Sequence, residues 1–278
     1  MSARARVWII VALAAAAAAG TVVGVTLATR NDVQRQSSKP PPFAPDPTAR
    51  PEVAQQVREA LQAWPAGTAR RLRILAARYP HSALVQLELG LALALSGQQA
   101  DATQAWQAAE RAQPDSPSAV RAQDLRHPGS PPGLPPFVPS FSQVTSAVQS
   151  QLLRGAAYQQ VLRPVSAERA FLTAVKAAPN NPEALTAAAV GLYDKDRPAL
   201  AFSRLGPLAR RFPHAQTVRF HLGLLLIYFG DMPRARRELA LARTQGPRTL
   251  LGKRAAILLR AGRKPYRTIR HKDEPFGL

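Results

Sequence analysis

The feature that most constrains this chain is a pattern of small residues and prolines that recurs every 34 residues. The segments Leu84–Pro114 and Thr217–Pro247 share few identical residues, yet Gly, Gly, Ala, Ala and Pro fall at the same offsets in both. The prolines that close successive copies lie 34 residues apart, in the sets Pro80 and Pro114, then Pro179, Pro213 and Pro247. A fixed period of this length predicts an array of similar supersecondary units.

Five segments fit the pattern when each is aligned on one position in its first half. These positions are Gly90, Gly155 and Gly223, with Ala189 and Gln56 in the other two copies. Twelve residues later four copies have a small residue, namely Ala102, Ala167, Ala201 and Ala235. The copy aligned on Gln56 is degraded, with Thr68 at this position and Ala69 beside it. Sixteen residues after the aligned position comes a large apolar residue, namely Trp106, Phe171, Leu205, Leu239 and Leu72.

These residue types suit a unit of two antiparallel helices. Small residues in the first helix and at the start of the second let the two backbones approach closely, and the large residue fills the space between hairpins. The closing proline ends the second helix because it cannot continue the hydrogen-bond ladder. Gly97 and Gly230 are expected at the turn between the helices, where a left-handed backbone costs least in glycine.

The pattern resembles the tetratricopeptide repeat, whose 34-residue period distinguishes it from armadillo, ankyrin and leucine-rich arrays. The resemblance covers repeats 1–2 at 49–116 and repeats 3–5 at 148–249, followed by an expected capping helix at 250–262. It implies an all-α, right-handed α-solenoid of about five helical hairpins. It also implies a concave groove, lined by the first helices, that binds peptides or partner proteins.

We expect the groove to present apolar or neutral side chains, and we expect part of the set to belong to the core instead. One subtype of the family grips a carboxylate with charged residues, and this composition does not suit it. The predicted groove residues are Leu84, Leu87, Leu91, Gln149, Gln159, Thr186, Tyr193, Phe220, Leu224 and Tyr228.

The N-terminus predicts a membrane anchor. After a short basic tail at 1–6, residues 7–28 contain no charged side chain and would form a helix of about 33 Å, enough to cross a bilayer core of about 30 Å. The alternative is a cleavable signal peptide, whose apolar stretch is normally shorter. Flanking positive charges do not decide the orientation. A short tail before a single span favours repeats outside the cytoplasm, on a Pro-rich linker at 29–48.

A Pro-rich insertion is expected at 117–147, between the second and third repeats. Its densest part, Arg126–Phe141, has too many prolines for a helix and suits an extended, polyproline-like path. One interpretation is a linker between two blocks of repeats. The favoured interpretation is that its apolar side chains dock on the repeats of the same chain, namely Leu134, Phe137, Val138 and Phe141.

The formal net charge is +20, and the excess of basic residues is densest near the C-terminus. Codon usage with a solvated surface explains this in the repeats. In the basic tail at 263–278, a contact to anionic lipid or polymer is the equal alternative to an inert end. The residues expected to make such a contact are Arg260, Arg263, Lys264, Arg267, Arg270 and Lys272.

No pattern of residues supports catalysis, a metal site or a cofactor. Catalytic and phosphate-binding motifs are absent from the sequence, and the chain has no cysteine. The histidines are scattered, and His81 and His214 each follow a closing proline, which a shared turn explains. Asp194 and Asp196 fall at a hairpin turn, where an acidic residue is expected to cap the next helix, with Pro198 in its first turn. No enzyme and no small-molecule substrate is therefore expected.

The sequence thus predicts a single-pass, membrane-anchored scaffold of the bacterial cell envelope that binds other proteins or peptides. The alternative is a basic protein whose arginines engage anionic lipid, polymer or nucleic acid, with the repeats as support.

Overall fold

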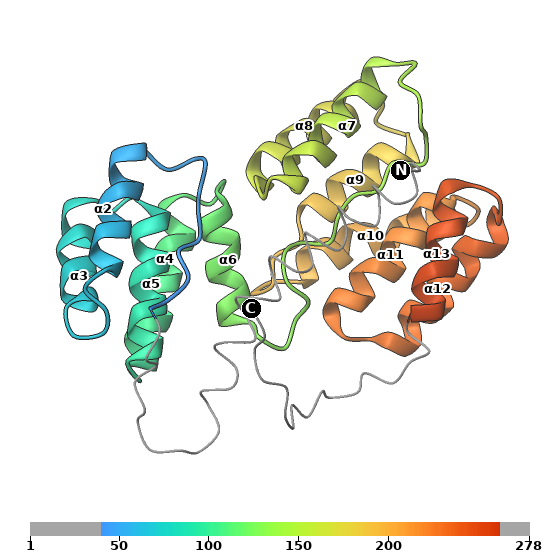
Figure 1. The fold of residues 1–278 in the computed structure, drawn as a ribbon. Helices are drawn as coiled ribbons and strands as arrows, with labels where there is room; N and C mark the ends of the chain where they lie inside the picture. The colour runs from blue at the N-terminus through green and yellow to red at the C-terminus, as the bar shows by residue number, and fades with distance from the viewer. Residues whose placement is uncertain (1–39, 262–278) are drawn as a thin grey trace, which may run out of the picture.

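Residues 40–261 are described by a computed structural model, and helices are the regular secondary structure throughout that range (Figure 1). The expected all-α class is therefore confirmed. The twelve helices of this range are α2 (Pro51–Leu61), α3 (Thr68–Arg78), α4 (Ala83–Leu95), α5 (Gln99–Ala112), α6 (Pro117–Arg126), α7 (Ala147–Gln160), α8 (Pro164–Ala177), α9 (Pro182–Gly191), α10 (Ala199–Arg211), α11 (Gln216–Phe229), α12 (Met232–Gln245) and α13 (Leu250–Ala261).

Successive helices pack against each other as hairpins. The pairs are α2 with α3, α4 with α5, α7 with α8, α9 with α10, and α11 with α12. Gly97 and Gly230 lie at the turns of two hairpins with φ of 79° and 87°, the left-handed conformation that glycine adopts without strain. The first helices also contact one another, α2 with α4, α7 with α9, and α9 with α11.

The aligned small and large residues meet inside the hairpins. A Cβ added at Gly90 would collide with the indole of Trp106, and one at Gly155 would collide with the ring of Phe171. The alanines twelve residues after the aligned positions are all fully buried, as are Trp106 and Phe171. The small residues are therefore required because each one leaves room for the large residue of the paired helix.

Helix α6 differs from the expectation for residues 117–147. Pro117 occupies its first turn, where the missing N–H costs nothing, and the side chain of Ser116 accepts a hydrogen bond from the Ala119 N–H. No proline follows until Pro128, so the helix runs to Arg126 and packs on α5 and α4. The extended part of the insertion is consequently limited to residues 127–146.

The C-terminal helix α13 packs on α12 and α11, the position expected for a helix that covers the last hairpin. The predicted membrane segment 7–28 and the basic tail 263–278 lie outside the described residues. Within 40–261, no helix is both long and apolar enough to cross a membrane.

Candidate peptide-binding faces

Two extended segments of the chain lie on faces made by the first helices of the hairpins and, for one segment, by α6 as well. In Figure 1 the blue stretch after residue 40 runs beside α4 and α6, and the green stretch after α6 runs past α9 and α11 to α7. We call these surfaces the α4/α6 face and the α7/α9/α11 face. The sequence predicts a binding groove along the first helices, which include α4, α7, α9 and α11 but not α6.

The main chain of the second segment is held by one side chain from each helix of the α7/α9/α11 face. The Phe137 N–H donates to Gln159 Oε1 of α7 at 2.7 Å, and the Val138 N–H donates to His221 Nε2 of α11 at 2.9 Å. The Ser140 N–H donates to a carboxylate oxygen of Glu183, in the first turn of α9, at 2.6 Å. Hydrogen bonds to the main chain hold an extended segment whatever its side chains are.

Apolar side chains of the same segment are buried on the face. Phe137 is only 3% exposed, and its ring stacks on His221 at 5.0 Å between centroids and meets Phe171 edge-on at 5.4 Å. Val138 belongs to the cluster of Phe220 and Leu224. Leu134 and Phe141 pack against the neighbouring clusters. The docking expected from the sequence is thus confirmed for all four apolar residues of the insertion.

His221 is the buried polar centre of this face. Its Nδ1 lies 2.7 Å from the carbonyl oxygen of Thr217, so Nδ1 carries the proton and Nε2 is free to accept the hydrogen bond from Val138. Complete burial is the main reason that the pKa of His221 falls to about 4, and the positive charge of Arg254 lowers it further. The imidazole is therefore neutral near pH 7, in the one tautomer that can bind the segment.

The first segment is held on the α4/α6 face in a related way. The Ala44 N–H donates to Glu88 Oε1 of α4 at 3.0 Å, in a buried position. Arg121 of α6 donates to the Pro45 carbonyl at 3.0 Å, and Asp46 accepts from the Ser118 N–H at 3.1 Å. Pro45 contacts Arg121, and the next residue, Asp46, contacts the earlier residue Ser118. The segment is therefore antiparallel to α6.

Glu88 is buried with little compensation. Burial raises its pKa to about 8, against the opposing effects of the Ala44 N–H and the Arg121 charge. Its second oxygen, Oε2, has no hydrogen-bond partner. A carboxyl group in this position is mostly protonated at pH 7 and still offers Oε1 as an acceptor.

Charged residues fix the start of the second segment between α6 and the loop after α9. Lys195, whose side chain is 1% exposed, pairs with Asp124 and donates to the Pro131 carbonyl at 2.8 Å. Arg126 pairs with Glu110 at 2.8 Å and with Asp196 at 2.9 Å. The expectation that the two aspartates of this loop cap the next helix is wrong for both of them.

Helix α10 has Pro198 at its N-cap and no side-chain cap. Asp194 instead accepts a hydrogen bond from Gln123 of α6, at 3.1 Å, and Asp196 pairs with Arg126 and His127 of the same region. The two aspartates therefore tie the loop between α9 and α10 to α6 and to His127 after it.

The predicted groove residues have different places in the structure. Leu84, Leu87 and Leu91 are core residues of α4, and Thr186 is fully buried. Tyr193, Phe220 and Leu224 are buried beneath the second segment, with Gln159 and Tyr228 half-buried around it. Gln149 is also half-buried and accepts from the Thr145 N–H at 2.7 Å, which fixes the loop before α7.

Glu88 and His221, which hold the two segments, are not among the binding residues predicted from the sequence. A signal for them exists, because each lies two residues before an aligned glycine, Gly90 or Gly223. Each is also a polar residue within an apolar stretch of its helix, where burial requires a partner.

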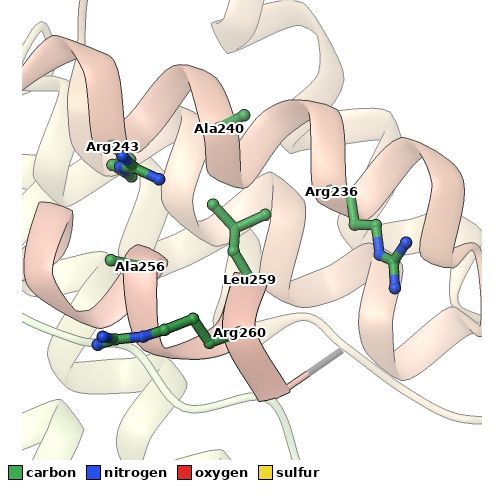
Figure 2. A pocket seen from close by; sticks show the side chains of 6 residues that line it. All are labelled: Arg236, Ala240, Arg243, Ala256, Leu259 and Arg260. Atoms are coloured by element: carbon green, nitrogen blue, oxygen red, sulfur yellow. The ribbon is translucent and has the colours of Figure 1, made fainter. Parts of the chain in front are cut away.

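A separate basic pocket lies at the C-terminal end of the described chain, between α12 and α13. Its volume is about 690 Å³, and its lining is Arg236, Ala240, Arg243, Ala256, Leu259 and Arg260. Figure 2 shows the three arginines arranged around Leu259 and the two alanines. Arg260 was predicted to contact an anionic surface. The other residues predicted for that contact, Arg263, Lys264, Arg267, Arg270 and Lys272, lie outside the described residues.

Among residues 40–261, no three His, Asp or Glu side chains are grouped so that they could hold a metal ion. Comparison of the chain with family models, with curated proteins and with solved structures finds no match in any of the three.

Proposed function

We propose that this protein is a membrane-anchored helical-repeat scaffold that binds extended segments of partner proteins on the faces of its first helices. The hairpins would form a right-handed α-solenoid of the tetratricopeptide type, with a final helix that covers the last hairpin. The two faces would then be successive parts of its concave groove.

One observation carries this proposal: both faces hold an extended segment through hydrogen bonds from helix side chains to its main chain. On the α7/α9/α11 face, Gln159, His221 and Glu183 each accept from a backbone N–H of the segment. Acceptors that are directed at a main chain, with His221 fully buried among them, suit the recognition of polypeptide better than that of a lipid or a nucleic acid. The side chains buried beside them would select the sequence that binds.

The site of action is proposed to be the cell envelope. Residues 7–28 would anchor the chain in the bilayer, and the Pro-rich segment after them would carry the repeats on the extracytoplasmic side. A reporter fused after Leu278 that is active only outside the cytoplasm tests this orientation. Activity of a cytoplasmic reporter at the same position would contradict it.

The binding function is tested by capture of proteins from detergent-solubilised membranes. The wild type is compared with the variant Phe137→Ala/Val138→Pro, which lacks the buried ring and the N–H that bonds to His221. We expect the variant to capture more partner protein than the wild type. This binding should persist in about 0.5 M salt, a concentration that screens interactions between surface charges. A synthetic peptide of residues 132–142 should release it. Capture that is equal for both proteins and insensitive to the peptide contradicts the proposal.

The arginine-lined pocket between α12 and α13 favours a second candidate, a contact to anionic lipid or polymer. The guanidinium groups of Arg236, Arg243 and Arg260 surround a partly apolar floor, which suits an anion that carries an apolar portion. Pelleting with anionic liposomes that falls steeply with salt, and falls again in Arg243→Gln/Arg260→Gln, would support this candidate. Neutral liposomes are the control.

A further inference from the structure

We propose that the α7/α9/α11 face is a recognition site for the sequence Pro-Pro-Phe-x-Pro in a partner protein, and that residues 135–139 occupy this site in cis. The inference rests on the proposed function and specifies its ligand. It follows from a comparison of the two segments and of the two faces that hold them.

The two docked segments share a sequence. Residues 41–45 read Pro-Pro-Phe-Ala-Pro, and residues 135–139 read Pro-Pro-Phe-Val-Pro. The first proline and the fourth residue are buried in both segments, while the second proline is exposed in both. The two segments therefore present the same positions to the helices.

The two faces bind the fourth residue of the motif through side chains at equivalent positions of the repeat. The Ala44 N–H donates to Glu88, and the Val138 N–H donates to His221. Both acceptors lie two residues before the aligned glycine of a first helix, Gly90 in α4 and Gly223 in α11. The same contact between the same positions, made twice with unrelated side chains, indicates a recognition mode that belongs to the repeat. Incidental packing would not be expected to pair the same position of the motif with the same position of the repeat in both places.

Each position of the motif has a physical role on the α7/α9/α11 face. Prolines keep the segment extended before it binds and so reduce the entropy lost on docking. Phe137 fills the space between His221 and Phe171. The fourth residue must not be proline, because its N–H is required by His221. The site therefore selects a phenylalanine that is flanked by prolines and followed by a residue with a free N–H.

The cis segment would compete with any partner. A tethered ligand acts at an effective concentration in the millimolar range, so a partner with a similar motif binds strongly only after residues 135–139 leave the face. The α7/α9/α11 face offers more recognition than the α4/α6 face because Phe137 is buried on it, whereas Phe43 is only half-buried, beside Arg58. We therefore assign the exchange to the α7/α9/α11 face.

The test uses the full chain with protease sites inserted after Ser130 and after Gln143, both outside the contacts described for residues 131–141. Cleavage at the two sites turns the docked segment into a peptide that can dissociate. It also divides the rest of the chain after Ser130, and every helix of the α7/α9/α11 face stays in the fragment that begins at residue 144. A fluorescent peptide of residues 132–142 is then added, and its binding is followed by anisotropy. We expect saturable binding to the cut protein and at least tenfold weaker binding to the uncut protein.

Peptide variants separate recognition of the motif from binding of any extended chain. Phe137→Ala and Val138→Pro in the peptide should each weaken binding at least tenfold, whereas Val138→Ala, which keeps the N–H, should weaken it less. A peptide of residues 39–47, which carries the other copy of the motif, should compete, and a scrambled peptide should not. Equal binding of all these peptides overturns the motif and leaves the proposed function standing. Binding of none of them to the cut protein overturns both.

The variant Phe137→Ala/Val138→Pro provides an independent route if cleavage disturbs the fold. Helix content by circular dichroism shows whether this variant is folded, and the same peptides are then titrated into it. The variant keeps the motif only at residues 41–45. If the folded variant forms dimers that the peptide of residues 132–142 dissociates, the occupant is residues 41–45 of a second copy of this chain, and the assignment to a partner protein is overturned.

Discussion

The backbone N–H of Val138 donates to Nε2 of His221 at 2.9 Å, although 83 residues separate the two along the chain. The contact is possible only for one tautomer of a neutral imidazole, and the hydrogen bond from Nδ1 to the Thr217 carbonyl selects that tautomer. Docking of the Pro-rich segment is therefore linked to the protonation state of a single buried side chain.

This link predicts a loss of stability in acid. The pKa of His221 is about 4 in the folded protein and about 6.5 when unfolded, so its contribution is fully present above pH 6.5 and is lost as the pH falls towards 4. A difference of this size corresponds to about 3 kcal/mol of unfolding free energy. Urea unfolding of the wild type and of His221→Gln, at pH 7.5 and at pH 4.5, measures it. The Gln variant keeps an acceptor and does not titrate, so the wild type should lose more stability than the variant. Equal losses would contradict the role of His221.

Glu88 predicts the opposite dependence. Its pKa is raised from 4.5 to about 8 by burial, so its contribution is fully present below pH 4.5 and is lost as the pH rises through 8. Glu88→Gln keeps the acceptor for the Ala44 N–H without acquiring a charge. We expect this variant to be more stable than the wild type at pH 8.5, by about 3 to 5 kcal/mol, and to have little advantage at pH 5. Denaturant titrations at the two pH values provide the measurement. An advantage that does not change with pH would show that Glu88 is not titrating.

The pairing of small and large residues inside the hairpins predicts that substitutions at paired positions have non-additive effects on stability. A Cβ at Gly223 would lie 2.8 Å from Cγ of Leu239, so Gly223→Ala should destabilise the protein by about 1 to 3 kcal/mol through overpacking. Leu239→Ala removes a side chain that is 2% exposed and should cost about 2 to 5 kcal/mol. In the double variant the alanine methyl at position 223 enters the space left by Leu239, so the combined cost should be less than the sum. Costs that add would mean that the two positions do not share this space.

The core of the hairpins was predictable because one steric requirement recurs in three copies, at Gly90, Gly155 and Gly223. Gly90 and Trp106 illustrate it, since the glycine is needed where the indole of the paired helix lies, and the spacing of 16 residues repeats with the period. Helix α6 was missed because prolines at Pro114 and Pro117 look like breaks, whereas Pro117 in fact occupies a first turn.

The binding faces were harder to predict than the core. His221 and Glu88 are single polar residues whose partners are backbone N–H groups. Every residue except proline has such a group, so the sequence does not identify the partner. The apolar residues of the insertion indicated that it would dock. The position of each insertion residue on the helices depends on hydrogen bonds between residues far apart in the chain. The 34-residue repeat pattern does not predict these hydrogen bonds.

Docking of the insertion predicts protection from proteolysis. Cleavage needs several extended residues to leave the protein surface together, and the Phe137 N–H is held by Gln159 at 2.7 Å. Chymotrypsin should therefore cut after Phe137 slowly in the wild type. Gln159→Ala removes that acceptor without changing a buried apolar side chain, and cleavage should become several-fold faster. Mass spectrometry of the fragments identifies the cut. Immediate cleavage of the wild type after Phe137 would show that the segment is not held on the α7/α9/α11 face.

The turn of the third hairpin predicts a stabilising substitution. Leu162 has φ of 57° and lies seven residues after Gly155, just as Gly97 and Gly230 lie seven residues after the aligned glycines of their own copies. A left-handed conformation costs a leucine roughly 1 to 2 kcal/mol, whereas glycine adopts it freely. Because Leu162 is half-buried, its loss removes some apolar contact. Leu162→Gly should therefore raise stability by up to about 1 kcal/mol.

The matched control for this substitution reverses it at an equivalent turn. Gly230→Leu places a branched side chain at φ of 87°, with no atom within 4 Å of the new Cβ, so backbone strain is the cost that the structure shows for it. We expect it to lower the unfolding temperature by several degrees, while Leu162→Gly raises it by about 2 to 4 °C. Calorimetry of the two variants beside the wild type compares both effects directly. If Leu162→Gly destabilised the protein and Gly230→Leu had no effect, the seventh position would not be the left-handed turn that follows α4, α7 and α11.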